Sequence, residues 1–270
     1  MSAKASGIFK PPSAEEVKRR ERERAKMNQK EKLMNQKKEA ELEEFLNSLP
    51  VAGKDELDFA LSRPVLYYPG AGKDFVPFRR FAEDSSVKTV VYCDYSKVDV
   101  CEVMKNCIQN ISDEYEAGGI KRVEPDALGK NSWDEFWPED PASRENRNPD
   151  DACGFFAEIL LKTQNRKISF MYLATEGIQT YKILFSEKKV NPKVLVIPDP
   201  GMSAWDSFQG TESKLYEIAK PAPPEIIYTD EQRAWPGYER VSEFGDYEGA
   251  NNSARAIYKM GGNRKNDTRI

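Results

Sequence analysis

The chain has 270 residues, which suits one full-sized α/β domain with an appendage and is short for two independent enzymatic domains. It contains no histidine, which excludes a Ser-His-Asp or Cys-His nucleophile system, a histidine metal ligand and a histidine pH switch. The net charge of −4 argues against a surface that binds nucleic acid generally as a polyanion.

Cysteine usage and hydropathy point to a reducing compartment. The chain has no apolar run of about 18 residues and no signal-peptide pattern, so we expect a soluble, cytoplasmic protein that does not enter a membrane. No two cysteines form a C-x-x-C pair, which disfavours a tightly bound transition metal and leaves only oxygen ligands suited to Mg²⁺ or Ca²⁺. We therefore predict no tightly bound transition metal and assign no residue as a metal ligand; a divalent cation held by carboxylates stays open as the alternative. The four cysteines are Cys93, Cys101, Cys107 and Cys153.

Residues 1–50 predict a charged N-terminal arm. Ser13 is a candidate N-cap, and the absence of glycine and proline from there to Asn47 predicts one helix over 14–47. No heptad is sustained, which disfavours a self-sufficient coiled coil. Two interpretations stay open, a solvated charged helix and an arm that binds a protein partner or drives assembly. The apolar residues that we expect to dock the end of this helix on the main domain are Leu42, Phe45, Leu46 and Leu49.

Residues 51–244 alternate between short apolar runs and helical segments, which predicts a three-layer, Rossmann-like α/β domain with a mostly parallel sheet. The expected strands are 65–68, 89–93, a weak 120–123, 168–173, 194–197 and 226–228. The expected helices are 74–83, 99–110, 151–163, 177–186 and 207–219.

Two segments depart from this alternation. The acidic stretch 124–151 predicts an insertion loop that acts as a lid or binding loop, with an ordered surface excursion held by its tryptophans as the alternative. Residues 245–270 are rich in Asn, Gly and small side chains and predict a flexible C-terminal tail.

The stretch from Pro64 to Ser96 carries the clearest chemical signal. It reads as strand, glycine turn, helix and strand, with Gly70-Ala71-Gly72 in the turn and Asp94 at the end of the second strand. In a βαβ unit this order aims backbone N–H groups of the turn and helix start at a ligand, and brings a carboxylate within reach of a ribose. We therefore predict that Gly70, Ala71, Gly72 and Asp94 bind a cofactor.

These residues resemble motifs I and II of class I, Rossmann-like S-adenosylmethionine-dependent methyltransferases. Val65-Leu66, Gly70-Ala71-Gly72 and the segment 91–94 carry the resemblance, which covers about 32 residues. It implies that the glycine loop cradles S-adenosylmethionine or an adenine nucleotide and that the acid after the second strand binds the ribose hydroxyls. The motif is degenerate, because Tyr68 stands where the family has an acid and Asp74 where it has a third glycine.

Two later strand ends also carry carboxylates. Glu176 follows the apolar run 168–173, and Asp199 follows 194–197. Since ligands bind outside the carboxyl ends of parallel strands, both are candidates for an acid/base role. The alternative is that they only cap turns and helix starts.

Two hypotheses for function follow from these observations. The first is a nucleotide- or S-adenosylmethionine-binding Rossmann-like protein, with a degenerate methyltransferase as its narrower form. The second is a non-catalytic interaction or assembly protein that acts through its acidic face and its N-terminal helix.

Overall fold

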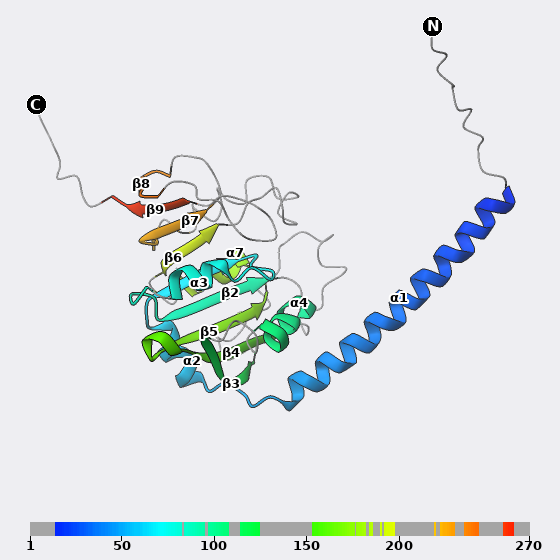
Figure 1. The fold of residues 1–270 in the computed structure, drawn as a ribbon, viewed down its shortest axis with the longest axis horizontal. Helices are drawn as coiled ribbons and strands as arrows, with labels where there is room; N and C mark the ends of the chain where they lie inside the picture. The colour runs from blue at the N-terminus through cyan, green and yellow to red at the C-terminus, as the bar shows by residue number, and fades with distance from the viewer. Residues whose placement is uncertain are drawn as a thin grey trace, which may run out of the picture. The chain divides into compact units, whose positions relative to one another are not determined.

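A computed structural model describes thirteen stretches of the chain, which form two compact units, Met1–Ser48 and Leu49–Ile270 (Figure 1). Each unit is considered by itself. The described residues are 14–82, 84–94, 97–107, 114–124, 153–175, 177–181, 184–185, 190, 192–197, 219, 222–229, 235–242 and 256–261.

The described part of the first unit, residues 14–48, forms one helix, α1 (Ala14–Ser48), of 35 residues. It forms because strong helix formers fill it without interruption and because exposed ion pairs link Arg19 to Glu23 at 3.8 Å and Lys37 to Glu41 at 3.6 Å. The predicted helix over 14–47 is therefore confirmed. Of the four residues expected to dock its end, Leu46 is buried, Phe45 and Leu49 are half-buried, and the side chain of Leu42 lies outside the described set.

The second unit is an α/β domain built on one mixed sheet of nine strands, in the order β3-β4-β5-β2-β1-β6-β7-β9-β8. The five strands β5, β2, β1, β6 and β7 are parallel, and β3-β4 and β9-β8 extend the sheet antiparallel at its two edges. The strands are β1 (Val65–Pro69), β2 (Thr89–Asp94), β3 (Tyr115–Val123), β4 (Cys153–Leu161), β5 (Arg166–Ala174), β6 (Pro192–Ile197), β7 (Ile226–Thr229), β8 (Tyr238–Arg240) and β9 (Ala256–Met260).

The predicted βαβ unit is confirmed. Helix α3 (Val76–Ala82) connects β1 to β2, and these strands pair in parallel with Tyr68 opposite Tyr92 and Pro69 opposite Cys93. All five residues of β1 are buried, as expected for a central strand that is covered on both faces.

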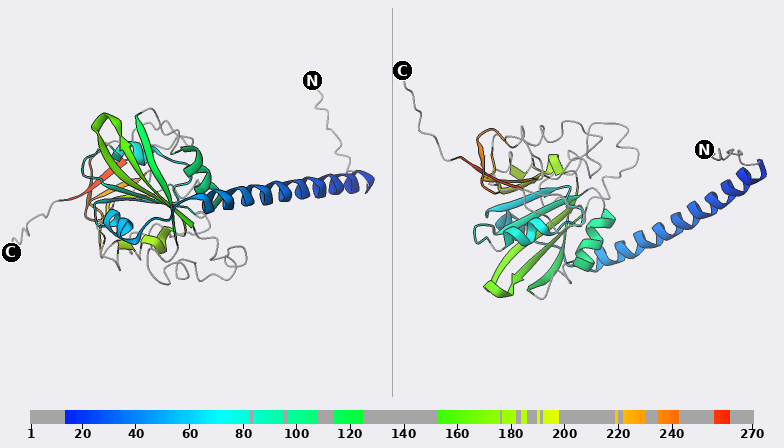
Figure 2. Two further views of the ribbon diagram at one scale, coloured as in Figure 1. Left: turned by 90° about the horizontal axis from the view of Figure 1, so that it is seen from below. Right: turned by 45° about the horizontal axis from the view of Figure 1, so that its top comes forward.

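Helices pack on both faces of the sheet (Figure 2, left). Alternate residues of β1 point to opposite faces, so Tyr67 packs on one side with α2 (Lys54–Leu61) and α7 (Gly177–Tyr181). Tyr68 lies on the other side, where it contacts the ring of Tyr92 in β2 and where Phe78 of α3 contacts Phe170 of β5. Helix α4 (Lys97–Glu102) continues into a π-helical turn, Val103–Cys107.

The expected helix over 151–163 is wrong, because this segment forms strand β4. Its apolar run is compatible with either structure, and the choice is made by pairing. A short 3₁₀ turn (Lys162–Gln164) and Asn165, with a left-handed φ of 47°, fold the chain back so that β4 pairs with β5 along its whole length. Strand β3 is correspondingly longer than the predicted 120–123, since it pairs with β4.

The expected tail 245–270 contains β9, which pairs with β7 and β8 and so belongs to the sheet. Beyond Glu124, the acidic segment 124–151 lies outside the described residues, as does the expected helix 207–219 apart from Ala219. None of the described helices combines the length and apolar character that a membrane crossing demands.

Candidate functional site

The candidate site lies at the topological switch point of the parallel strands, where the chain stops adding strands on one side of β1 and begins to add them on the other. From β1 the chain forms β2 on one side of it, continues to the edge strands β3 and β4, and then adds β5 beside β2. It returns to the other side of β1 to form β6 and β7. In open α/β sheets, ligands bind outside the carboxyl ends of the strands at such a switch point. Here that point is the end of β1, where the glycine turn begins.

The turn after β1 needs both of its glycines. Gly70 has a φ of 66° and Gly72 a φ of 51°, a left-handed conformation that other residues rarely adopt. The Ala71 N–H donates to the carbonyl oxygen of Cys93 at 2.9 Å, and the Gly72 N–H donates to Oδ2 of Asp94 at 2.9 Å. The turn is therefore held against the end of β2 by one backbone and one carboxylate hydrogen bond.

The two departures from the methyltransferase motif contact each other. The Tyr68 hydroxyl, on the strand, donates to Oδ2 of Asp74 at 2.9 Å. The other oxygen of Asp74 accepts the Val76 N–H at 3.0 Å, and the Asp74 N–H donates to the carbonyl oxygen of Ala71 at 3.0 Å. The Asp74 carboxylate thus lies beside the Tyr68 hydroxyl, next to the glycine turn.

Strand β5 supports the turn from the far side of β2. The Tyr172 hydroxyl donates to the carbonyl oxygen of Gly72, and the Thr175 N–H donates to the backbone oxygen of Asp94 at 2.8 Å. Sequence reasoning missed Tyr172 because nothing local marks a tyrosine in a buried strand as a partner of a loop one hundred residues away.

Gly177 is a second supporting residue that the sequence reasoning missed. A Cβ built at this position would lie 2.5 Å from Cβ and 3.0 Å from Cα of Pro69, so only glycine lets the start of α7 approach the end of β1 this closely. The buried Tyr67 hydroxyl donates to the Gly177 carbonyl oxygen and lies 3.3 Å from Sγ of Cys93. The signal available in the sequence was a glycine three residues after the end of an apolar run.

Of the predicted site residues, the structure brings Gly70, Ala71, Gly72 and Asp94 together at the ends of two neighbouring strands. Asp94 is half-buried. Glu176 and Asp199, the two acid/base candidates, lie outside the described residues.

Two features set the charge near the site, an ion pair of the turn and a buried tyrosine below β1. Lys73, in the turn, pairs with Glu102 of α4 at 2.8 Å, so the cation of the turn is already balanced by a carboxylate. Beneath β1, burial and, to a smaller extent, the nearby Tyr238 raise the pKa of Tyr181, which keeps its phenol neutral as a donor to the carbonyl oxygen of Ala222 at 3.2 Å. Within the described ranges, no three His, Cys, Asp or Glu side chains come together to hold a metal ion.

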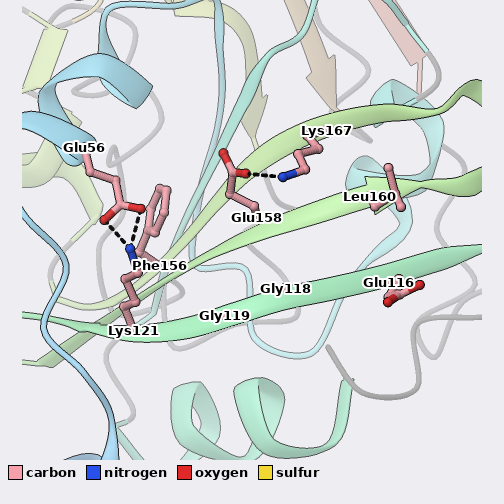
Figure 3. Close-up of a pocket in the computed structure, with 9 residues that line it drawn as sticks. All are labelled: Glu56, Glu116, Gly118, Gly119, Lys121, Phe156, Glu158, Leu160 and Lys167. Carbon is pink, nitrogen blue, oxygen red and sulfur yellow. Dashed lines mark hydrogen bonds and ion pairs between the residues drawn. The ribbon is translucent and has the colours of Figure 1, made fainter.

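A pocket of about 410 Å³ lies away from this site, on the face formed by β3, β4 and β5 (Figure 3). Four of its charged side chains pair with one another, with Lys121 bonded to both oxygens of Glu56 at 2.7 Å and Lys167 to Glu158 at 3.2 Å. The fifth, Glu116, pairs at 3.8 Å with Lys162, which lies outside the pocket lining. Because these charges are already paired, the pocket has little net charge with which to bind a charged ligand. The glycine turn therefore remains the candidate site. Its lining residues are Glu56, Glu116, Gly118, Gly119, Lys121, Phe156, Glu158, Leu160 and Lys167.

Comparisons of the chain with protein-family models, with curated proteins and with solved structures give no match.

Proposed function

We propose that this protein binds S-adenosylmethionine or an adenine nucleotide in a Rossmann-like domain, at the carboxyl end of β1. One observation carries the proposal: a turn with two left-handed glycines follows the central parallel strand, and its Gly72 N–H lies 2.9 Å from the carboxylate that ends the adjacent strand. The spatial order of the five parallel strands supports it. Numbered along the chain, they follow the order 3-2-1-4-5, which is the first five places of the order 3-2-1-4-5-6 in doubly wound dinucleotide-binding sheets.

The chemistry of the turn suits a ribose and its attached groups. Glycines without a Cβ let a ligand approach the backbone closely, and Asp94 offers a carboxylate that accepts hydrogen bonds from ribose hydroxyls. Asp94 also holds Gly72, so ligand binding and turn conformation are coupled through the same carboxylate. In the narrower form of the proposal, a degenerate methyltransferase, Glu176 or Asp199 serves as the acid/base.

Thermal unfolding with a panel of ligands tests this proposal. A ligand that binds only the native state stabilises it by mass action, so S-adenosylmethionine, its demethylated product or an adenine nucleotide should raise the melting temperature. Gly72→Val should abolish the shift, because its side chain strains a residue with a φ of 51° and blocks approach to the turn.

Gly119→Val is the matched control, since Gly119 has a φ of 48° and nothing within 4 Å of a built Cβ. It should lower the melting temperature by a similar strain and still respond to ligand. A wild-type melting curve that no member of the panel moves at saturating concentration would overturn the proposal.

One observation favours a second function, a non-catalytic interaction or assembly role for α1. The helix exposes Met27, Leu33 and Met34, with exposed fractions of 72%, 61% and 53%. Apolar side chains this exposed on a long helix suit a surface that a protein partner covers.

A further inference from the structure

We propose that α1 pairs with α1 of a second copy of this chain, in antiparallel orientation, with the midpoint between Lys30 and Glu31. This inference rests on the interaction role of α1 and is independent of the ligand proposed for the domain. Its first support is the uneven charge of the helix. Residues 17–32 carry eight Lys/Arg against three Glu, whereas residues 33–48 carry two Lys against four Glu. An antiparallel pair lays the basic half of each helix on the acidic half of the other.

One face of α1 carries this complementarity in detail. With 3.6 residues per turn, Arg20, Glu23, Met27, Met34 and Glu41 fall within one narrow stripe along the helix. The side chains of all five are exposed. Met27 and Met34 occupy the middle of the stripe, and the charged residues lie toward its ends.

The stripe is complementary to itself when one helix is reversed. Residues equally distant from the midpoint then lie at the same height on the two helices. Between Arg20 and Glu41, each such pair on this face is apolar with apolar or of opposite charge. The complementarity ends there, since Glu16 lies opposite Phe45. Because the arrangement is two-fold symmetric, every pair occurs twice in the dimer. The pairs are Arg20 with Glu41, Glu23 with Lys38, Met27 with Met34 and Lys30 with Glu31.

The parallel arrangement lacks this property. In a parallel, in-register pair each residue faces its own copy, so Arg20 faces Arg20, Glu23 faces Glu23 and Glu41 faces Glu41. Like charges at facing positions are destabilising. The charge order therefore selects the antiparallel pair over the parallel one.

The resulting dimer is weak and salt-sensitive. Each helix contributes only two methionines to the centre of the stripe, too few for the apolar seam of a self-sufficient coiled coil. Most of the attraction comes from exposed ion pairs, which salt screens over about 10 Å at 0.1 M ionic strength. We expect sedimentation equilibrium of the full chain to show concentration-dependent dimers at low salt and fewer dimers at high salt.

Charge reversal tests the facing pairs. Arg20→Glu should weaken dimerisation by about tenfold, because two attractive contacts per dimer become repulsive. The double variant Arg20→Glu/Glu41→Arg restores opposite charges in the antiparallel pair and should recover wild-type dimerisation. Circular dichroism of both variants establishes that the helix is retained. A chain that is monomeric at low salt and high concentration, or a double variant as weak as the single one, would overturn the inference.

Engineered cysteines test the orientation. In the antiparallel pair, Met27→Cys on one chain lies opposite Met34→Cys on the other, so a mixture of the two single variants should form a disulfide-linked heterodimer under mild oxidation. Met27→Cys alone should not, because the two copies of position 27 are offset by about 10 Å along the axis. The wild-type chain, whose Cys93 and Cys101 are buried, is the background control.

Efficient cross-linking of Met27→Cys alone would show a parallel pair and overturn the proposed orientation. The outcomes also separate the proposals. A monomeric chain that still captures a different protein through α1 would overturn self-pairing and keep the interaction role. A ligand-induced rise in melting temperature would be unaffected in Arg20→Glu.

Discussion

Tyr68 and Asp74 illustrate how single residues adapt the glycine turn. Each departs from the methyltransferase-like motif, yet the phenol of one donates to the carboxylate of the other at 2.9 Å. Asp74 also accepts the Val76 N–H and so links the turn to the start of α3. Compared with the motif position by position, Tyr68 and Asp74 are two mismatches. In the structure, however, their hydrogen bond holds a carboxylate beside the turn.

Asp84 provides a prediction about pH. Burial alone would raise the pKa of its carboxyl, but the neighbouring Ser86, whose N–H donates to Oδ1 of Asp84 at 2.8 Å, and the charges of Lys193 and Lys259 outweigh burial and lower it. A carboxyl with a lowered pKa in the folded state stabilises the protein above its unfolded pKa of about 4, and this stabilisation is lost as the pH falls through the folded value.

Asp84→Asn should therefore reduce the free energy of unfolding at pH 7 by less than about 1 kcal/mol, since the group is only partly buried and solvent screens it. The difference from wild type should vanish in strong acid. Urea unfolding at a series of pH values measures it, with the exposed Asp58→Asn as the control. A difference that grows as the pH falls would contradict the assignment.

At the scale of elements, the start of α7 closely approaches the end of β1. Gly177→Ala should displace α7 or the turn, because its Cβ would lie 2.5 Å from Cβ of Pro69 and the neighbouring Pro69 backbone cannot move aside cheaply. We expect a loss of about 1–3 kcal/mol in the free energy of unfolding, the usual cost of overpacking.

Gly118→Ala is the matched control, since a Cβ there meets only the carbonyl oxygen of Glu158 at an ordinary 3.6 Å. Denaturant unfolding of both variants makes the comparison. Equal stability of Gly177→Ala and Gly118→Ala would show that the approach of α7 to β1 imposes no constraint on position 177.

Strand β4 shows why elements with continuous apolar runs were hard to assign. The segment 153–161 contains two adjacent phenylalanines and three aliphatic residues with little period, which suits a buried helix or a buried strand equally. Its pairing with β5 decides the matter, and that pairing depends on the left-handed turn at Asn165. By contrast, β1 and β2 were predicted almost to the residue, because a glycine turn and a helical segment separate them.

At the scale of the whole molecule, α1 and the α/β domain are separate compact units, which leads to a prediction about truncation. Deleting residues 1–40 should leave the domain folded with little change in melting temperature, because the deleted part of α1 has few apolar side chains to bury. The deletion retains Leu42, Phe45 and Leu46. It should also remove a self-association or partner contact.

Thermal unfolding and sedimentation of the full and truncated chains measure both effects, with pull-down for a different partner. A large fall in melting temperature with unchanged association would show that the arm is a structural strut. A truncated chain that keeps both its stability and its association would show that residues 1–40 contribute to neither.

The sequence by itself determined the features that depend on interactions between residues close together in the chain. These are the long charged helix, the βαβ unit of residues 65–94, its glycine turn and the carboxylate at Asp94, each of which depends on neighbouring residues and on propensities that act over a few turns. Only the tertiary structure decided the antiparallel edges of the sheet, the contact of Tyr68 with Asp74 and the need for glycine at position 177. The physical reason is that strand pairing and close packing join segments far apart in the chain, and the free energy of those contacts overrides local preference.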